Sequence, residues 1–201
     1  GTQSKAAVNM GVKQTGAGSS YVELAWNAQL GAGHYHTQFS QDGKNWIDME
    51  YSSSPSDLVY NLTQGASYYA RVVAYNGSHY SGAHVMVSVS ETAIVSTKPT
   101  EVTGLTQTAA GVNSVSMSWN ASAGAASYVI YGYINYNWTQ IGTSATNSAT
   151  ITGVAATTST KFSVAAVKNV TGGTVTGDQC SGVEMKAIPI KVSRIAMQYY
   201  W

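Results

Sequence analysis

One ten-residue phrase occurs twice in this chain, 93 residues apart. Residues 26–35 read WNAQLGAGHY, and residues 119–128 read WNASAGAASY. Both copies begin with Trp-Asn-Ala, carry Gly-Ala in the middle and end in Tyr. Self-similarity at a fixed period is the sequence signature of a repeated structural unit. The chain is therefore expected to fold as two copies of one small domain.

The match continues on both sides of the phrase, with a one-residue slip in its later part. The aligned pairs are Gln14 with Gln107, Val22 with Val115, Leu24 with Met117 and Trp46 with Trp138. We expect a first domain over 1–97, a second over 98–188 and a C-terminal tail over 189–201. The tail repeats, at Pro189, Val192 and Ile195, the spacing of Pro99, Val102 and Leu105. It is either the first strand of a third repeat or a last strand packed against the second copy.

Within each copy the apolar residues alternate with polar ones. Val22, Leu24 and Trp26 follow this period of two, as do Val115, Met117 and Trp119. Such alternation is typical of half-buried strands, and no window of ten or more residues has the pattern of an amphipathic helix. In the first copy we expect further strands at 35–39, 46–50, 57–62, 68–76 and 84–90. Hairpin turns are expected at Asp42-Gly43 and Asn76-Gly77. The predicted fold class is all-β, with two consecutive immunoglobulin-like β-sandwiches.

Each copy resembles a fibronectin type III domain of the kind found in bacterial surface and secreted proteins. In that family the second strand ends in a core Trp, here Trp26 and Trp119, and the third opens with a core Tyr, here Tyr35 and Tyr128. Residues 62–68 have the spacing of the family's corner before the sixth strand. The resemblance implies that the Tyr68 hydroxyl bonds back to upstream backbone. The second copy has Phe162 instead, which has no hydroxyl, so we expect a softer edge there.

Composition excludes several classes of function. Charged residues are 9% of the chain and the formal net charge is +1. Without clustered Lys and Arg there is no electrostatic signature of nucleic-acid binding. No apolar run approaches the roughly 20 residues of a membrane-spanning helix, so we expect no membrane insertion of this segment. Cys180 is the single cysteine, which rules out an internal disulfide. We expect a monomer.

The residues offer little for catalysis. Asp48 and Glu50 are the closest pair of acids, and on a strand they would share a face. That strand is expected to be exposed, so nothing would shift a pKa toward acid–base work. There is no Gly-x-Ser-x-Gly elbow and no phosphate-binding loop before a helix. We expect no enzymatic activity and no cofactor.

All four histidines lie in the first copy. His34 and His36 are two apart on an expected strand and should share its outward face, where such a pair can chelate zinc or copper. A third ligand from His79 or His84 would have to reach across the intervening strand. We therefore predict surface histidines and no metal site, with His34 and His36 as weak candidates.

Aromatic residues are the stronger candidates for ligand binding. In the second copy Tyr131 and Tyr133 should face outward from a strand, with Tyr136 at the tip of its hairpin. In the first copy Tyr75 and Tyr80 flank the Asn76-Gly77 loop. Exposed aromatic rings can stack on sugars or anchor a protein partner. The alternative is that these tyrosines only cover the sheet.

The leading prediction is a non-enzymatic, extracellular spacer, adhesion or protein-interaction module of a larger cell-surface or secreted protein. Its partner would be a protein or a carbohydrate. The alternative is an accessory segment, either a spacer or a weak carbohydrate binder, of a secreted polysaccharide-degrading enzyme. Fold alone does not separate these two functions.

Overall fold

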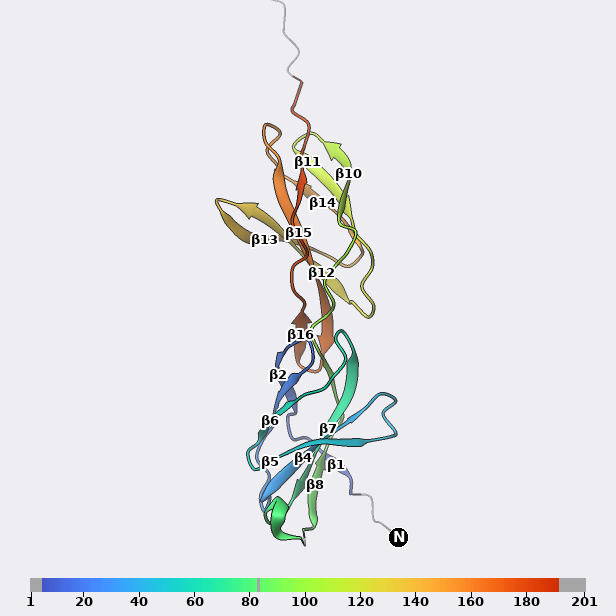
Figure 1. Ribbon diagram of the computed structural model, residues 1–201, viewed down its shortest axis with the longest axis vertical. Coiled ribbons are helices and arrows are strands. Elements are labelled where there is room, and N and C mark those ends of the chain that lie inside the picture. The colour runs from blue at the N-terminus through green and yellow to red at the C-terminus, as the bar shows by residue number, and fades with distance from the viewer. Residues whose placement is uncertain (1–4, 83, 192–201) are drawn as a thin grey trace, which may run out of the picture. The chain divides into compact units, whose positions relative to one another are not determined.

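The computed structural model describes residues 5–82 and 84–191, and strands dominate it (Figure 1). The first copy contains two sheets. One is three-stranded, in the order β2-β3-β6; the other runs β1-β8-β7-β4-β5, with β9 also paired to β7. The bounds are β1 (Ala7–Val8), β2 (Lys13–Ala17), β3 (Val22–Ala25), β4 (His34–Ser40), β5 (Ile47–Ser52), β6 (Ser56–Val59), β7 (Ser67–Tyr75), β8 (Met86–Ser90) and β9 (Ala93–Ser96). A short 3-10 helix, η1 (His79–Ser81), lies between β7 and β8.

The second copy repeats this arrangement. Its three-stranded sheet has the order β10-β11-β14, and its other sheet runs β13-β12-β15-β16, with β17 paired to β15. The bounds are β10 (Thr106–Gly111), β11 (Ser114–Ser118), β12 (Ser127–Ile134), β13 (Asn137–Ser144), β14 (Ser148–Thr152), β15 (Thr160–Val170), β16 (Gly173–Thr176) and β17 (Val183–Met185). The predicted all-β fold class is confirmed.

The five further strands predicted for the first copy are present, with ends that differ by a few residues. The largest difference is at β6, which was expected to run to Leu62 and ends at Val59. Asn61 has a positive φ of 60°, a left-handed conformation that does not continue a strand. Leu62 is nevertheless buried in the core, because the chain turns inward after the strand.

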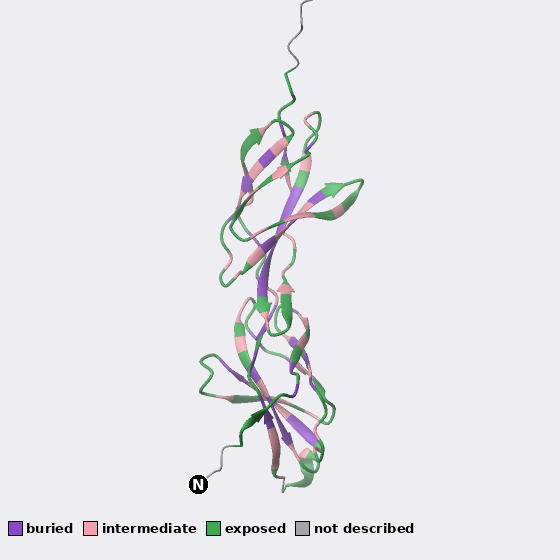
Figure 2. Ribbon diagram, turned by 180° about the vertical axis from the view of Figure 1, so that it is seen from behind, coloured by how far each residue is buried: buried purple, intermediate pink, exposed green. Residues whose placement is uncertain are grey.

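The core of the first copy lies between its two sheets. Val22, Leu24 and Val59 come from the three-stranded sheet, and Phe39 and Val72 come from the facing sheet. The alternation on β3 places Val22 and Leu24 inside and Glu23 outside, as the period of two predicts. Figure 2 shows buried residues concentrated along the long strands and exposed residues in the hairpins. Among the described residues, no helix has the length and apolar character needed to cross a bilayer.

The repeated phrase builds the same crossover between sheets in both copies. The rings of Trp26 and Tyr35 meet edge to face with centroids 5.3 Å apart, and so do those of Trp119 and Tyr128. Between them the chain makes a tight turn, in which the Ala32 amide donates to Gln29 and the Ala125 amide to Ser122, each at 3.1 Å. These turns need glycine, because Gly31 and Gly124 have φ values of 81° and 69°.

In both copies a glutamine side chain near the start of the copy bonds to the backbone near its end. The Gln14 side-chain amide bonds to the backbone of Ser96, with its nitrogen donating and its oxygen accepting. Gln107 makes the same two bonds to Lys186. Ile188 then forms a parallel bridge with Val112. The suggestion that the tail starts a third repeat depends on residues 192–201, which lie outside the described part of the chain.

The corner predicted for the first copy is present. The Thr63 backbone N–H donates to the Tyr68 hydroxyl at 3.0 Å, which ties the start of β7 to the chain five residues upstream. At the corresponding place in the second copy, the buried Phe162 ring fills the core without such a bond.

We predict that Tyr68→Phe destabilises the first copy by about 0.5–1.5 kcal/mol, because it removes the hydrogen bond from the Thr63 N–H to the Tyr68 hydroxyl. Chemical denaturation followed by fluorescence checks this, with Tyr69→Phe as the control because Tyr69 is exposed on the other face of β7. Equal effects of the two substitutions would contradict the role of the hydroxyl.

A second polar contact joins the two sheets of the first copy. The buried Thr37 hydroxyl, on β4, donates to the Asp57 carboxylate, on β6, at 3.0 Å. Burial raises the pKa of Asp57, while hydrogen bonds from the Leu58 amide and from Thr37 oppose this rise. A carboxyl whose pKa is raised on folding favours the folded state below its unfolded pKa of 3.8, and this contribution is lost as pH rises through the folded pKa.

We therefore expect Thr37→Val to raise the pKa of Asp57 further, because the substitution keeps the side-chain shape and removes the donor. Thr37→Ser, which keeps a hydroxyl, should leave the pKa close to its wild-type value. Carboxyl-detected NMR titration of the two variants measures the difference. A lower pKa of Asp57 in the Val variant would show that the hydrogen bond is not what stabilises the ionised carboxyl.

Candidate functional site

The four histidines gather with three tyrosines at one end of the first copy. His34 and His36 lie on β4, and His79 lies in η1, in the loop that joins β7 to β8. We expected His34 and His36 to be exposed on an outward face. They share that face, but neither is exposed: the His36 side chain is 14% exposed and His34 is 1% exposed. The β7–β8 loop covers His34, and the His34 Nδ1 atom lies 2.9 Å from the carbonyl oxygen of Gly77 in that loop.

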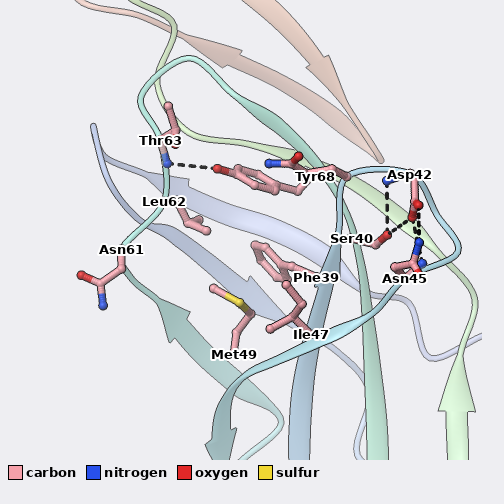
Figure 3. A pocket seen from close by; sticks show the side chains of 11 residues that line it. Phe39, Ser40, Asp42, Asn45, Ile47, Met49, Asn61, Leu62, Thr63 and Tyr68 are labelled. Carbon is pink, nitrogen blue, oxygen red and sulfur yellow. Dashed lines mark hydrogen bonds between the residues drawn. The ribbon is translucent and has the colours of Figure 1, made fainter.

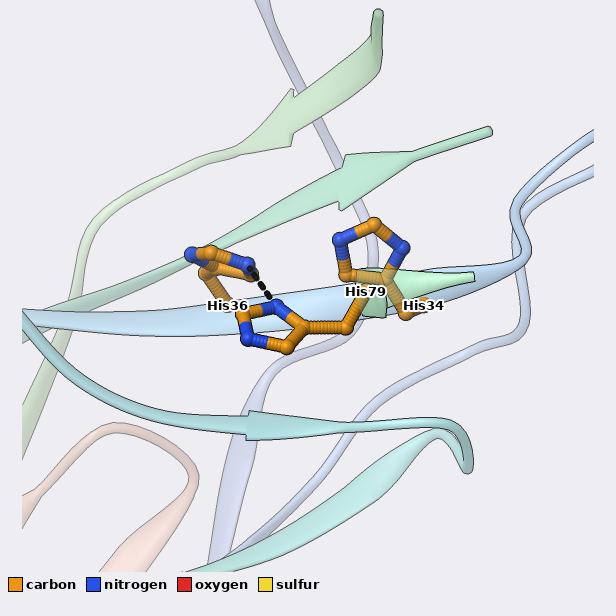
Figure 4. Close-up of side chains that lie close together, drawn as sticks. All are labelled: His34, His36 and His79. Atoms are coloured by element: carbon orange, nitrogen blue, oxygen red, sulfur yellow. Dashed lines mark hydrogen bonds between the residues drawn. The ribbon is translucent and has the colours of Figure 1, made fainter. Parts of the chain in front are cut away.

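The expectation that a third histidine could not reach this pair is also wrong. The β7–β8 loop folds back over β4, so that His79 Nδ1 lies 3.3 Å from His36 Nε2. One ring nitrogen from each of His34, His36 and His79 lies within 4.8 Å of the others. Figure 4 shows the three side chains drawn together from β4 and the loop.

Each of these three rings is oriented by a neighbour. The Gly77 carbonyl faces His34 Nδ1, and the Asp48 carboxylate lies 3.8 Å from His36 Nδ1. The His79 ring stacks on Tyr51 with centroids 3.8 Å apart and planes 7° from parallel. Burial lowers the pKa of His36; Asp48 opposes this shift, and His34 and His79 reinforce it. A neutral imidazole, which a lowered pKa favours, is the form that binds metals.

Two buried ring nitrogens in this cluster have no hydrogen-bond partner. They are His34 Nε2 and His84 Nδ1. Leaving a buried polar atom unpartnered costs about 1–3 kcal/mol. Nearly all buried polar groups in native proteins are satisfied, so such exceptions require an explanation.

Tyr75 and Tyr80, predicted as possible ligand contacts, lie at this same cluster but differ in exposure. Tyr75 is half-buried, and its ring packs against His34, His36 and His84 with centroid distances of 5.3, 4.8 and 4.8 Å. It therefore supports the histidines and offers little free surface. Tyr80 is 81% exposed, and its hydroxyl contacts that of Tyr51. A ligand role for the two tyrosines stays a prediction.

The predicted aromatics of the second copy lie on the β12–β13 hairpin. Tyr131 is half-buried and Tyr133 is exposed, and Tyr133 is paired in register with Trp138, whose ring lies 5.3 Å away. Tyr136 is 94% exposed in the two-residue turn, where it and Asn135 both have positive φ. We call Tyr133, Tyr136 and Trp138 the hairpin aromatics. Trp138, which aligns with Trp46 of the first copy, also contributes its ring to this surface.

A groove of about 570 Å³ lies beside the corner of the first copy (Figure 3). Phe39, Ile47 and Met49 are among its apolar lining residues. At its rim Asp42 accepts bonds from the Lys44 and Asn45 amides, the Asn45 side chain and Ser40, which hold the pKa of Asp42 well below its usual range. None of the residues lining the groove has a buried polar atom without a partner. The groove therefore lacks the unmet polar groups found at the histidine cluster.

No family model matches the chain. It is 33% identical over 162 residues to Chitinase A1 of Niallia circulans, and this match covers 77% of the chain and 22% of the chitinase. The chain thus spans about a fifth of the length of that relative. The matched length exceeds that of either copy, so both copies contribute to it.

Similar solved structures include two from chicken. One is a two-domain fibronectin type III segment of tenascin, at 15% identity and a TM-score of 0.43, covering 88% of this chain and 97% of that one. The other is the CNTN1 FN1–FN3 segment, at 15% identity and a TM-score of 0.49, covering 90% and 68%.

The sheets themselves provide the evidence for the fold. In the first copy the β2-β3-β6 sheet faces a sheet in which β4 and β7 lie side by side, with β5 at one edge. In the second copy the β10-β11-β14 sheet faces a sheet in which β12 and β15 lie side by side, with β13 at one edge. The chain has the fold of two consecutive fibronectin type III domains, as the sequence resemblance implied.

Proposed function

We propose that this chain is a non-catalytic accessory segment of a larger extracellular protein that acts on a polysaccharide, and that it serves there as a spacer. The observation that carries the proposal is the 33% identity to a chitinase across both copies, over only 22% of that protein's length. A segment of that size, built from two sandwiches, leaves the remainder of such a protein for catalysis.

The closest pair of acids in the sequence, Asp48 and Glu50, supports a non-catalytic role. Asp48 accepts a hydrogen bond from the Gln38 side chain at 2.7 Å and lies beside His36. Neither Asp48 nor Glu50 lines the groove beside the corner. A pair of carboxylates working on a glycoside needs a substrate-sized site between the two groups. We place this polysaccharide-related role ahead of the adhesion role that the sequence favoured, since the chitinase similarity supports only the former.

We predict that replacing the segment in its parent protein by a Gly/Ser chain of equal length lowers hydrolysis of insoluble polymer but not of a soluble oligosaccharide. A Gly/Ser chain is a flexible coil that visits short end-to-end distances, whereas a folded sandwich cannot collapse. The measurement is the ratio of the two rates before and after replacement. An unchanged ratio would contradict the spacer role.

A second function, weak binding to the polymer, is favoured by the hairpin aromatics. Tyr133 and Trp138 offer adjacent rings, and Tyr136 projects from the turn beside them. Flat apolar rings with a polar tip are suited to surfaces that are partly apolar and partly wet. Sugar rings in an extended polysaccharide present such a surface.

We expect the chain to co-sediment with chitin and the double variant Tyr133→Ala/Tyr136→Ala to bind more weakly. If each ring contributes about 1 kcal/mol, as in other aromatic pairs, the affinity falls about 30-fold. The matched control is Tyr60→Ala/Tyr69→Ala, which removes two exposed tyrosines from the first copy. Binding that falls equally in both variants, or no binding by the wild-type chain, would exclude the hairpin aromatics as a chitin-binding surface.

A further inference from the structure

We propose that His34, His36 and His79 form a zinc-binding site that joins β4 to the β7–β8 loop of the first copy. Imidazole nitrogen is a preferred ligand of zinc, and three protein ligands with one open position form a common zinc geometry. The site is independent of the spacer role and of the hairpin aromatics, which belong to the second copy.

The spacing of the nitrogens suits a tetrahedral ion. Two nitrogens at about 2.0–2.1 Å from zinc, at a tetrahedral angle, lie about 3.3 Å apart. His36 Nε2 and His79 Nδ1 lie 3.3 Å apart. The three ligand nitrogens lie within 4.8 Å of one another, so a small rotation of the rings brings all three to one ion.

The surroundings of His34 and His36 indicate which nitrogen of these two rings is free. Metal-binding histidines commonly donate their other N–H to a carboxylate or a backbone carbonyl. Here the Gly77 carbonyl faces Nδ1 of His34, and the Asp48 carboxylate lies near Nδ1 of His36. Both arrangements favour the tautomer in which Nε2 carries no proton and is available to an ion.

The buried Nε2 of His34 is an independent sign of a ligand. The residue is 1% exposed, and this nitrogen has no hydrogen-bond partner. The hydrogen bond between His36 and His79 gives one nitrogen of each of these rings a partner, but it leaves His34 Nε2 without one. A zinc ion also satisfies His34, which explains why a buried ring presents an unpaired nitrogen toward its two neighbours.

The fourth position of the ion has room for a small ligand. A cavity of about 350 Å³ borders the site, lined in part by His34, Tyr51, Ser78, His79 and Tyr80. Its lining contains hydroxyl groups but no carboxylate. We therefore expect water, or an oxygen of a bound molecule, to complete the coordination.

The test is calorimetric titration of Zn²⁺ into the full chain after treatment with a chelator, beside the variants His36→Ala and His79→Ala. Both residues are half-buried, so these variants should keep the fold, and circular dichroism checks this. We expect one equivalent of zinc in the wild-type chain and at least about 100-fold weaker binding in either variant. Absence of zinc binding by the wild-type chain, or binding of equal affinity in folded variants, would overturn the site.

Two further variants test the assigned roles. Asp48→Asn should weaken zinc binding about 10- to 100-fold, as is typical when an outer-shell partner of a ligand is lost. Glu50→Gln, on the same strand, should leave it unchanged. His84→Gln should also retain binding, because His84 supplies no ligand. Loss of binding in His84→Gln but not in His79→Ala would show that the ligand set is wrong.

Discussion

The packing of one tryptophan against one tyrosine at the crossover between the two sheets supports the rest of each copy. Trp26 directly follows β3 of one sheet and Tyr35 is the second residue of β4 in the other, and their rings meet edge to face. The Gln29 amide donates to the Tyr35 hydroxyl at 3.0 Å, which secures the turn between them. Both indole nitrogens, of Trp26 and Trp119, are buried without a partner, so the pair is stabilised by buried area and ring geometry.

Because this packing uses only the inner face of β4 and β12, the outer faces of these strands are free to differ. The outer face of β4 carries His34 and His36, and the outer face of β12 carries Tyr131 and Tyr133. Equivalent strands of one repeat therefore present two histidines in one copy and two tyrosines in the other. Substitutions on this outer face leave the core packing unchanged, because successive side chains of a strand point to opposite faces.

The loop between β7 and β8 in the first copy, and its counterpart between β15 and β16 in the second, determine whether the outer face is covered. In the first copy β7 ends at Tyr75 and β8 begins at Met86, so a long loop crosses back over His34 and His36. In the second copy β15 ends at Val170 and β16 begins at Gly173, which leaves only a tight turn. The difference in loop length converts an exposed pair of histidines into a cluster of three with a buried member.

Local patterns in the sequence were sufficient for most of the fold. The period of two placed Val22 and Leu24 inside, and the repeated phrase identified both core Trp–Tyr pairs. The family resemblance at the corner implied a bond from Tyr68 to upstream backbone, which the structure shows at Thr63. These features depend on residues close together in the chain or on a single face of one strand. Two predictions from the sequence were wrong. β6 ends at Val59, before the left-handed Asn61, and the histidines are less exposed and closer together than expected.

The sequence by itself therefore determined the number of copies, the fold class and the inward faces of the strands. Only the tertiary structure decided that His79, 43 residues beyond His36, would lie against it, and that His34 would be buried. The physical reason is that strand periodicity specifies the side to which a residue points, whereas the path of a loop depends on long-range packing. The sequence indicated a connecting segment between β7 and β8, but it did not indicate that this segment folds back over β4.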